Sequence, residues 1–286
     1  MNFTTVARTI YLFLIAIIIL TGCRDTTMNQ QPSSLQTSSL SEKDWTALSL
    51  KKIYFGHMSV GSNIIDGIKD LMSKNPEIKL NIQETSDIST FQNGVFAHSN
   101  NGQNANPKSK IDAFVTTMNS GIGNRADIAF FKFCYVDFDE NTDVKDVFNY
   151  YKTAMNSLVK KYPNTVIPHA TVPLTTEAER LRIKERVKDI IKKIIGRATR
   201  ADLNVASNIK RNEFNALLIK EYDEKNILDI AAYESTSPDG KEYLSKSAGA
   251  KHRSMVPAYT TDGGHLNEKG RLVVADKFIA KLAGIR

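Results

Sequence analysis

The chain contains the stretch Ile53-Tyr54-Phe55-Gly56-His57-Met58-Ser59-Val60-Gly61-Ser62-Asn63, in which a short apolar run passes into a turn rich in glycine and serine. The apolar run predicts a strand over residues 52–55. Apolar side chains then recur at helical spacing, from Ile64 to Leu71, until Asn75-Pro76 stops the pattern. We therefore expect a strand, a tight turn that carries Ser59, and a helix.

The same alternation of short apolar runs and helical patterns continues along the chain. Further strands are predicted at residues 78–82, 128–136, 165–170 and 226–230. Further helices are predicted at residues 111–118, 144–162, 177–195, 206–222 and 267–283, the last with Asn267 as its N-cap. The pattern predicts an α/β fold, a three-layer α/β/α sandwich around a five-stranded parallel, flavodoxin-like sheet. A polar segment at residues 85–107 is expected to be a long loop.

Ser59 is expected just beyond the carboxyl end of the first strand. Ligands of parallel α/β sheets bind at that edge. The N–H groups and the dipole of the following helix stabilise negative charge there. The hydroxyl therefore suits an acyl-transfer nucleophile, whose tetrahedral intermediate carries an oxyanion, but it also suits an ordinary helix N-cap.

A second informative stretch, Asp262-Gly263-Gly264-His265-Leu266-Asn267-Glu268-Lys269-Gly270, precedes the last predicted helix. His265 can take and return a proton near neutral pH. Asp262 can hold the imidazole tautomer and stabilise the imidazolium. Alone, the stretch also fits a surface histidine in a glycine-rich turn. With Ser59 it completes a set of nucleophile, base and orienting acid.

This combination resembles the SGNH (GDSL-like) hydrolases, a family of esterases, lipases, thioesterases and carbohydrate deacetylases. The resemblance is carried by Ser59 with its neighbours Gly56 and Gly61, by the Asp262-x-x-His265 string, and by the strand layout of the body. It implies a nucleophile at Ser59, a base at His265 and an acid at Asp262.

The chain departs from the pattern of that family at two points. The family has Gly-Asp-Ser at the nucleophile, whereas this chain has Gly56-His57-Met58-Ser59. The family also has a Gly-x-Asn-Asp string whose Asn donates to the oxyanion, whereas this chain has Phe133-Cys134-Tyr135-Val136-Asp137. Loss of one oxyanion donor costs on the order of 10²–10³ in rate.

Other groups are candidates to replace that amide. We expect Gly61, the Gly102 N–H and the Asn104 side chain to bind the oxyanion or the substrate, although the Asn-rich run around Gly102 also fits a solvated turn. Lys132 and Tyr135, near the end of the third predicted strand, are alternatives.

The remaining sequence gives no sign of a metal or cofactor. It has no HxxH, HExxH or paired-cysteine spacing, no phosphate loop and no dinucleotide fingerprint. We therefore expect neither a metal nor a cofactor. His98 and His169 are expected near strand ends, where they can line the pocket. Cys134 lies in an apolar run and is expected to be inert.

Residues 1–22 predict a secretory signal. Arg8 precedes an apolar run of about ten residues, half of the roughly 20 that span a bilayer. Leu20-Thr21-Gly22-Cys23 resembles the lipobox of bacterial lipoproteins, which implies cleavage before Cys23 and acylation of Cys23, for example with palmitate. Two or more acyl chains form a stable membrane anchor.

Residues 23–44 are polar and predict a disordered tether between the lipidated Cys23 and a folded body at residues 45–286. With Cys23 acylated, Cys134 has no partner for a disulfide. The net charge of +7 is spread along the chain, and the basic cluster at residues 180–193 also contains acids. This pattern argues against nucleic-acid binding and allows a weak attraction to anionic lipids.

The sequence thus predicts a membrane-anchored serine hydrolase of carboxylic esters in a bacterial cell envelope, with its body outside the cytoplasm. Small-molecule or glycan esters are the expected substrates, including acetyl groups on glycans. Two alternatives stay open: a glycan-binding lipoprotein without activity, and a transferase of acetyl groups between envelope sugars. The acyl group, the alcohol and the oligomeric state are not defined by the sequence.

Overall fold

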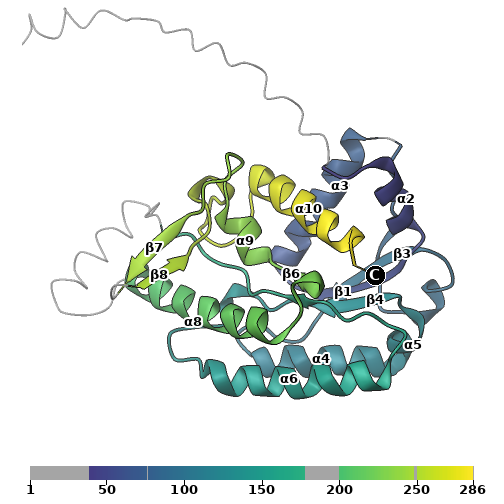
Figure 1. Cartoon of the computed structure of the whole chain (residues 1–286), viewed down its shortest axis with the longest axis horizontal. Coiled ribbons are helices and arrows are strands. Elements are labelled where there is room, and N and C mark those ends of the chain that lie inside the picture. Colours follow the sequence, from purple (N-terminus) through teal and green to yellow (C-terminus); the bar gives the residue numbers. More distant parts are fainter. Residues whose placement is uncertain (1–38, 76, 178–199, 248–249, 286) are drawn as a thin grey trace, which may run out of the picture. The chain divides into compact units, whose positions relative to one another are not determined.

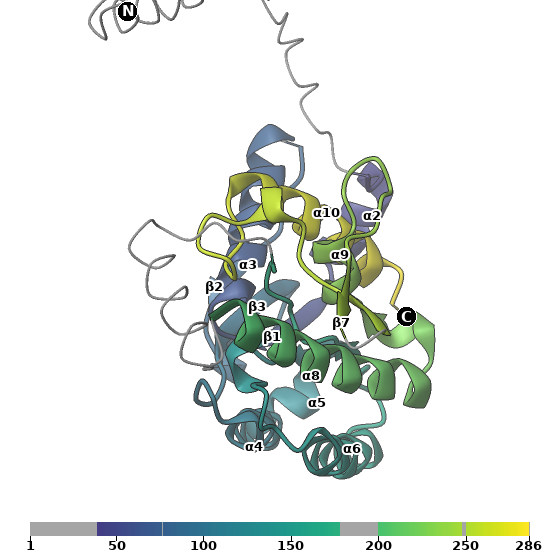
Figure 2. The same ribbon diagram turned by 90° about the vertical axis from the view of Figure 1, so that its left-hand side faces the viewer.

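The computed structural model describes residues 39–75, 77–177, 200–247 and 250–285. Its main sheet is parallel, and helices cover both of its faces (Figure 1, Figure 2). In spatial order the strands are β2 (Ile82–Glu84), β3 (Val95–Asn100), β1 (Lys52–His57) and β4 (Ile128–Phe131). The described α-helices are α2 (Glu42–Ser49), α3 (Val60–Lys74), α4 (Pro107–Thr117), α5 (Gly123–Arg125), α6 (Val144–Lys161), α8 (Arg200–Glu221), α9 (Ile230–Ser235) and α10 (Glu268–Ala283). The predicted α/β class is confirmed.

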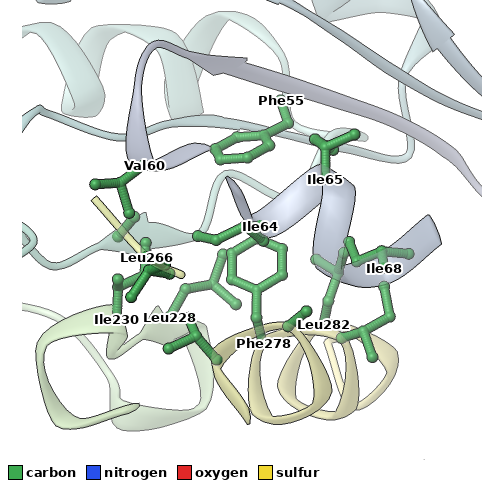
Figure 3. Close-up of a cluster of buried hydrophobic side chains, with 14 of the residues drawn as sticks. Phe55, Val60, Ile64, Ile65, Ile68, Leu228, Ile230, Leu266, Phe278 and Leu282 are labelled. Atoms are coloured by element: carbon green, nitrogen blue, oxygen red, sulfur yellow. The ribbon is translucent and has the colours of Figure 1, made fainter. Parts of the chain in front are cut away.

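Strand β1 is buried on both sides, which explains its unbroken apolar run. Side chains alternate between the faces of a strand. Ile53 and Phe55 therefore pack into the cluster of α3 and α10, while Tyr54 packs into the cluster of α4 and α6. Figure 3 shows Phe55 against apolar side chains of α3 and α10.

Helices α3 and α10 lie side by side on one face of the sheet (Figure 1, Figure 3). Their close approach depends on Gly67, because a Cβ there would lie 2.3 Å from the carbonyl oxygen of Arg271. Phe278 of α10 fills the space beneath Phe55. Since α3 follows Ser59 and α10 follows His265, this packing brings the two predicted catalytic segments to one edge of the sheet.

The prediction of a five-stranded sheet is wrong, because the main sheet has four strands. The predicted strand at residues 165–170 meets β4 at a single bridge, between Ile128 and Val166. Pro168 follows and has no N–H to donate to a ladder. Beyond it, β5 (His169–Ala170) pairs with β6 (Ile227–Leu228) in a separate two-stranded sheet.

The prediction of a long loop at residues 85–107 is also wrong, because β3 lies inside that segment and pairs with both β1 and β2. Only Val95-Phe96-Ala97 is apolar there, and three polar residues complete the strand. The apolar run is too short to stand out from the surrounding Asn, Ser and Gly. The strand is nevertheless central, and its His98 side chain is buried.

The predicted helices at 144–162, 206–222 and 267–283 correspond to α6, α8 and α10. Asn267 caps α10 as expected, and its Oδ1 accepts from the Gly270 N–H at 2.9 Å. Strands β7 (Leu244–Ser247) and β8 (Ala250–Arg253) form an antiparallel hairpin that was not predicted.

The folded part begins earlier than the predicted boundary at residue 45. Helix α2 starts at Glu42, and Ser41 caps it in a capping box with Asp44. Its side chains Trp45 and Leu48 are buried in the cluster of α3 and α10. The predicted boundary between tether and body therefore falls within α2.

The predicted signal, the lipidation site at Cys23 and the tether up to residue 38 lie outside the described residues, as does most of the predicted helix at 177–195. Within the described ranges, no helix combines the length and the apolar character that a membrane crossing requires.

Candidate active site

Ser59 occupies the turn between β1 and α3 with φ 56° and ψ −109°. A positive φ is uncommon for a residue other than glycine, and such strain concentrates at functional sites. The side chain makes no capping hydrogen bond to α3. Instead, its Oγ lies 2.6 Å from Nε2 of His265, a residue 206 positions away in the chain.

Asp262 and His265 share one turn before α10. Asp262 Oδ2 lies 2.6 Å from His265 Nδ1. Asp262 Oδ1 accepts from the N–H groups of Gly264 at 2.9 Å and His265 at 2.8 Å. These bonds fix the carboxylate against the ring. Gly263 permits the turn, since its φ is +101°.

The hydrogen bonds keep Asp262 ionised. Partial burial raises the pKa of Asp262, but the hydrogen bonds from Gly264 and from the N–H and ring of His265 outweigh it and hold that pKa well below its usual range. An ionised carboxylate at Nδ1 fixes the proton there, which leaves Nε2 as the acceptor for the Ser59 hydroxyl. The His265 and Asp262 side chains are 45% and 54% exposed, so the set faces solvent.

The turn at Ser59 and the loop after β3 also present backbone donors. Among the described residues, none accepts a hydrogen bond from the N–H groups of Ser59, Val60 or Gly102. The Gly61 N–H, by contrast, donates to Met58 O at 3.1 Å.

Gly61 has a packing role beside Ser59. A Cβ there would lie 2.4 Å from the His57 Cβ. Real Cβ contacts do not approach so closely, so His57 requires glycine at this position.

The loop after β3 carries the other two predicted oxyanion residues. Gly102 has φ +66°, and a Cβ there would lie 2.6 Å from Lys110 Cα. The Asn104 Oδ1 accepts from Lys110 Nζ at 3.1 Å. Among the described residues, no hydrogen bond joins Gly102 or Asn104 to Ser59.

Two lysines, Lys110 and Lys132, are fully buried behind the turn that carries Ser59. The sequence marked Lys132 as a candidate near the site but gave no sign of Lys110. Lys110 Nζ lies 3.7 Å from Asp137 Oδ2, in a pair with no exposed side-chain surface. Lys132 Nζ donates to Phe133 O at 3.1 Å and lies 3.6 Å from Cys134 Sγ. Burial lowers the pKa of Lys132, and it raises the pKa of Asp137 against the pull of Lys110.

Cys134, which was predicted to be inert, is completely buried. The thiol lies 3.5 Å from Met58 O, beneath the turn that carries Ser59.

His98 and His169 are buried, and their rings contact other side chains of the interior. His98 Nδ1 lies 3.1 Å from His57 Nε2. His169 Nδ1 lies 2.7 Å from the Tyr151 hydroxyl, and its ring stacks on Tyr222. Burial lowers the pKa of both His57 and His169 to about 3. The expectation that His98 and His169 line a pocket is therefore not met.

Sequence reasoning missed Arg211, which lies on α8. Its Nε donates to Tyr135 O at 2.8 Å, and the Tyr135 ring contacts that of His265 edge to face, with centroids 5.6 Å apart. No periodicity or motif marks Arg211, because arginine is a common surface residue of helices.

The described part of the chain contains no group of three or more His, Cys, Asp or Glu side chains that could hold a metal ion. A cavity of about 570 Å³ lies between α4 and α6 and is lined by residues such as Asp112, Tyr150 and Lys161. None of its lining residues belongs to the set around Ser59.

Comparisons with known proteins give similar structures only. No family model matches the chain, and no curated protein matches it. A candidate platelet activating factor from Streptococcus pneumonia is 13% identical, with TM-score 0.43, over 82% of this chain and 89% of that one. A candidate lipolytic protein of the G-D-S-L family from Desulfitobacterium hafniense DCB-2 is 11% identical, with TM-score 0.37, over 82% and 99%. A serine-to-alanine mutant of an acetyl esterase, with acetate ion, is 12% identical, with TM-score 0.40, over 82% and 96%. At such identities and TM-scores these likenesses carry no conclusion about activity.

Proposed function

We propose that this chain is an SGNH-like serine hydrolase of carboxylic esters, with Ser59 as nucleophile, His265 as general base and Asp262 as the orienting acid. One observation carries the proposal. Hydrogen bonds of 2.6 Å on both sides of the His265 ring connect the Ser59 hydroxyl to the Asp262 carboxylate. A nucleophile joined to a base, and a base joined to an orienting carboxylate, is the arrangement that acyl transfer requires.

The reaction would proceed through an acyl-enzyme. Ser59 Oγ attacks the ester carbonyl while His265 Nε2 takes the hydroxyl proton. The tetrahedral intermediate collapses, the bond to the alcohol breaks, and the imidazolium returns the proton to the departing alkoxide. Water, deprotonated by His265, then attacks the acyl group, and Ser59 regains its proton as the carboxylic acid leaves. Asp262 stays ionised throughout and stabilises the imidazolium.

We assign the oxyanion to backbone donors. The Ser59 N–H lies at the start of α3, where the helix dipole also stabilises negative charge. The N–H of Gly102 is the proposed second donor, on the loop after β3. Since the stretch Phe133–Asp137 lacks the Asn that the family uses as an oxyanion donor, we expect turnover to be slower than in an enzyme with a full set of donors.

We also propose that Cys23 is lipidated and anchors the body to a membrane of the cell envelope, outside the cytoplasm. The proposal rests on the lipobox-like Leu20-Thr21-Gly22-Cys23. Esters of envelope sugars, acetyl esters among them, would then be within reach. Growth with labelled palmitate should label the wild-type protein and leave Cys23→Ala unlabelled. Equal labelling of the two would refute the anchor and leave the catalytic proposal intact.

Covalent labelling with a fluorophosphonate tests the nucleophile. We expect the wild type and Ser62→Ala to be labelled and Ser59→Ala to be unlabelled. Ser62 is the matched control because it lies three residues away and is exposed. Labelling of Ser59→Ala would contradict the assignment. An unlabelled wild type that binds sugars would indicate a binding protein instead.

A further inference from the structure

Arg211 connects two loops that lie on separate segments of the chain. It projects from α8, is buried, and donates from Nε to Tyr135 O at 2.8 Å. From Nη1 it donates to Thr175 Oγ1 at 2.9 Å and to Asn208 Oδ1 at 2.7 Å. The guanidinium thus joins the loop after β4 to the loop after β5.

The first of these loops contacts the catalytic turn through Tyr135. The Tyr135 ring lies edge to face against His265, and the Arg211 guanidinium carbon lies 5.7 Å from the centroid of the same ring. Gly264 leaves room for the ring, since a Cβ there would lie 2.5 Å from Tyr135 Cζ. Any shift of Tyr135 would therefore be transmitted to Gly264 and His265.

The second loop holds the catalytic turn through its backbone. The Thr176 N–H donates to the Gly263 carbonyl at 2.9 Å. The neighbouring Thr175 is fixed on both sides of its peptide, because Asn208 Oδ1 accepts from its N–H at 3.1 Å and Asn208 Nδ2 donates to its carbonyl at 2.8 Å. Arg211 donates to that same Asn208 oxygen and completes the attachment.

We infer that Arg211 is a positioning residue, which fixes Tyr135 and the loop at Thr175–Thr176 and through them sets the orientation of the His265 ring toward Ser59. This inference rests on the proposed function of the site. A planar guanidinium can serve three acceptors in fixed directions, whereas the ammonium of lysine is a compact charge without that geometry. Arg211 stays cationic at neutral pH, since burial lowers its pKa only to about 10.

The test compares Arg211→Lys, Arg211→Ala and the control Asn212→Ala. Asn212 is adjacent on α8, and its side chain hydrogen-bonds to the backbone of Arg253 and to the helical carbonyl of Asn208 rather than to Tyr135 or Thr175. We expect the fluorophosphonate labelling rate to fall about 10- to 100-fold in both Arg211 variants, because a displacement near 1 Å costs about that much. Asn212→Ala should stay within about twofold of the wild type at equal folded fraction.

Chemical rescue distinguishes a positioning role of Arg211 from a contribution to the stability of the fold. Guanidinium ion, added at concentrations that leave the wild type folded, should restore part of the labelling rate of Arg211→Ala but not that of Arg211→Lys, whose ammonium fills the site. Wild-type rates in Arg211→Lys, or equal losses in Asn212→Ala, would overturn the inference. Should Arg211→Ala fail to fold, Arg211→Lys decides, since it keeps the buried charge.

A second readout does not depend on activity. The low-field proton resonance of the hydrogen bond between His265 and Asp262 should shift or broaden in Arg211→Lys and persist in Asn212→Ala. An unchanged resonance in Arg211→Lys would contradict the positioning role. An unlabelled wild type would instead refute the proposed function, while this resonance would still report on Arg211.

Discussion

Two histidine sites border the turn that carries Ser59, and they differ in every property that matters for proton transfer. His265 is half exposed and lies between Ser59 and an ionised Asp262. His57 precedes Ser59 by two residues, yet it is buried, contacts His98, and has no described partner for its Nδ1. The same residue type is therefore a candidate base in one place and a packing group in the other.

The difference lies in solvation and in the neighbouring charge. Burial lowers the pKa of His57 to about 3, and the positive charge of Lys132 acts in the same direction. At His265 the adjacent charge is negative, and water reaches the ring. Closeness to Ser59 in sequence is thus a poor guide to the candidate base, and the surroundings of each histidine ring decide its role.

The largest expected effect separates these two histidines directly. His265→Ala should lower kcat/KM for p-nitrophenyl acetate by about 10⁴-fold or more, because the nucleophile loses its base. His57→Gln should cost less than about tenfold, since that ring takes no proton at neutral pH. Initial rates measured at equal folded fraction check both values. Similar losses of kcat/KM in the two variants would contradict the assignment of different roles to His265 and His57.

The next effect concerns the acid. Asp262→Asn should lower kcat by about 10³-fold, because an amide favours the wrong imidazole tautomer. Asp223→Asn, at an exposed aspartate far from His265 in the sequence, serves as the control and should leave kcat within about twofold. A loss below tenfold in Asp262→Asn would mean that the exposed carboxylate contributes little.

The burial of His57 should be detectable in the pH dependence of the free energy of unfolding. His57 and His169 remain neutral in the folded protein down to about pH 3, whereas unfolded histidine takes a proton near pH 6.5. The unfolded state then binds more protons, so stability falls as the pH drops from 6.5 towards 3. Between pH 6.5 and 4.5 each histidine should contribute a loss of about 2 kcal/mol.

Urea unfolding at pH 6.5, 5.5 and 4.5 measures this loss in the wild type and in His57→Gln. The variant should lose about 2 kcal/mol less than the wild type. The comparison must be made between the two proteins, because burial raises the pKa of Glu234 to about 8 and its protonation acts in the opposite direction. Equal slopes would show that water reaches His57.

The smallest expected effect concerns the contact between Gly264, which precedes His265, and the Tyr135 ring. Gly264→Ala places a Cβ 2.5 Å from Tyr135 Cζ and should displace that ring, with a loss of about tenfold in kcat and little change in stability. Gly284→Ala is the matched control, since the nearest atom to its Cβ lies at 3.4 Å. Unchanged kcat in Gly264→Ala would show that Tyr135 can move without disturbing His265.

The fold class was predictable from local patterns, and the grouping of Ser59, His265 and Asp262 was predicted from two short motifs together with the family resemblance that they carry. Short apolar runs predict buried strands, and a strand that enters a helix predicts the edge where Ser59 lies. Strand β3 escaped detection because half of it is polar. It lies between β1 and β2, and its buried His98 contacts His57, which no local pattern shows.

The burial of charged side chains behind the site could not be predicted from the sequence. Lysine and arginine are almost never fully buried without partners. The partners of Lys110 and Arg211 include Asp137, Tyr135 and Thr175, which come from other segments. Only the folded chain brings these groups together, so their positions could not be derived from spacing.

The separation of Ser59 from His265 by 206 residues also has a consequence for biosynthesis. A nascent chain that has emerged only as far as β8 already possesses its hydroxyl nucleophile but not the imidazole that activates it. The site is completed when α10 docks on α3. Any reaction that needs both groups could therefore begin only after the whole segment from β1 to α10 has left the ribosome and folded.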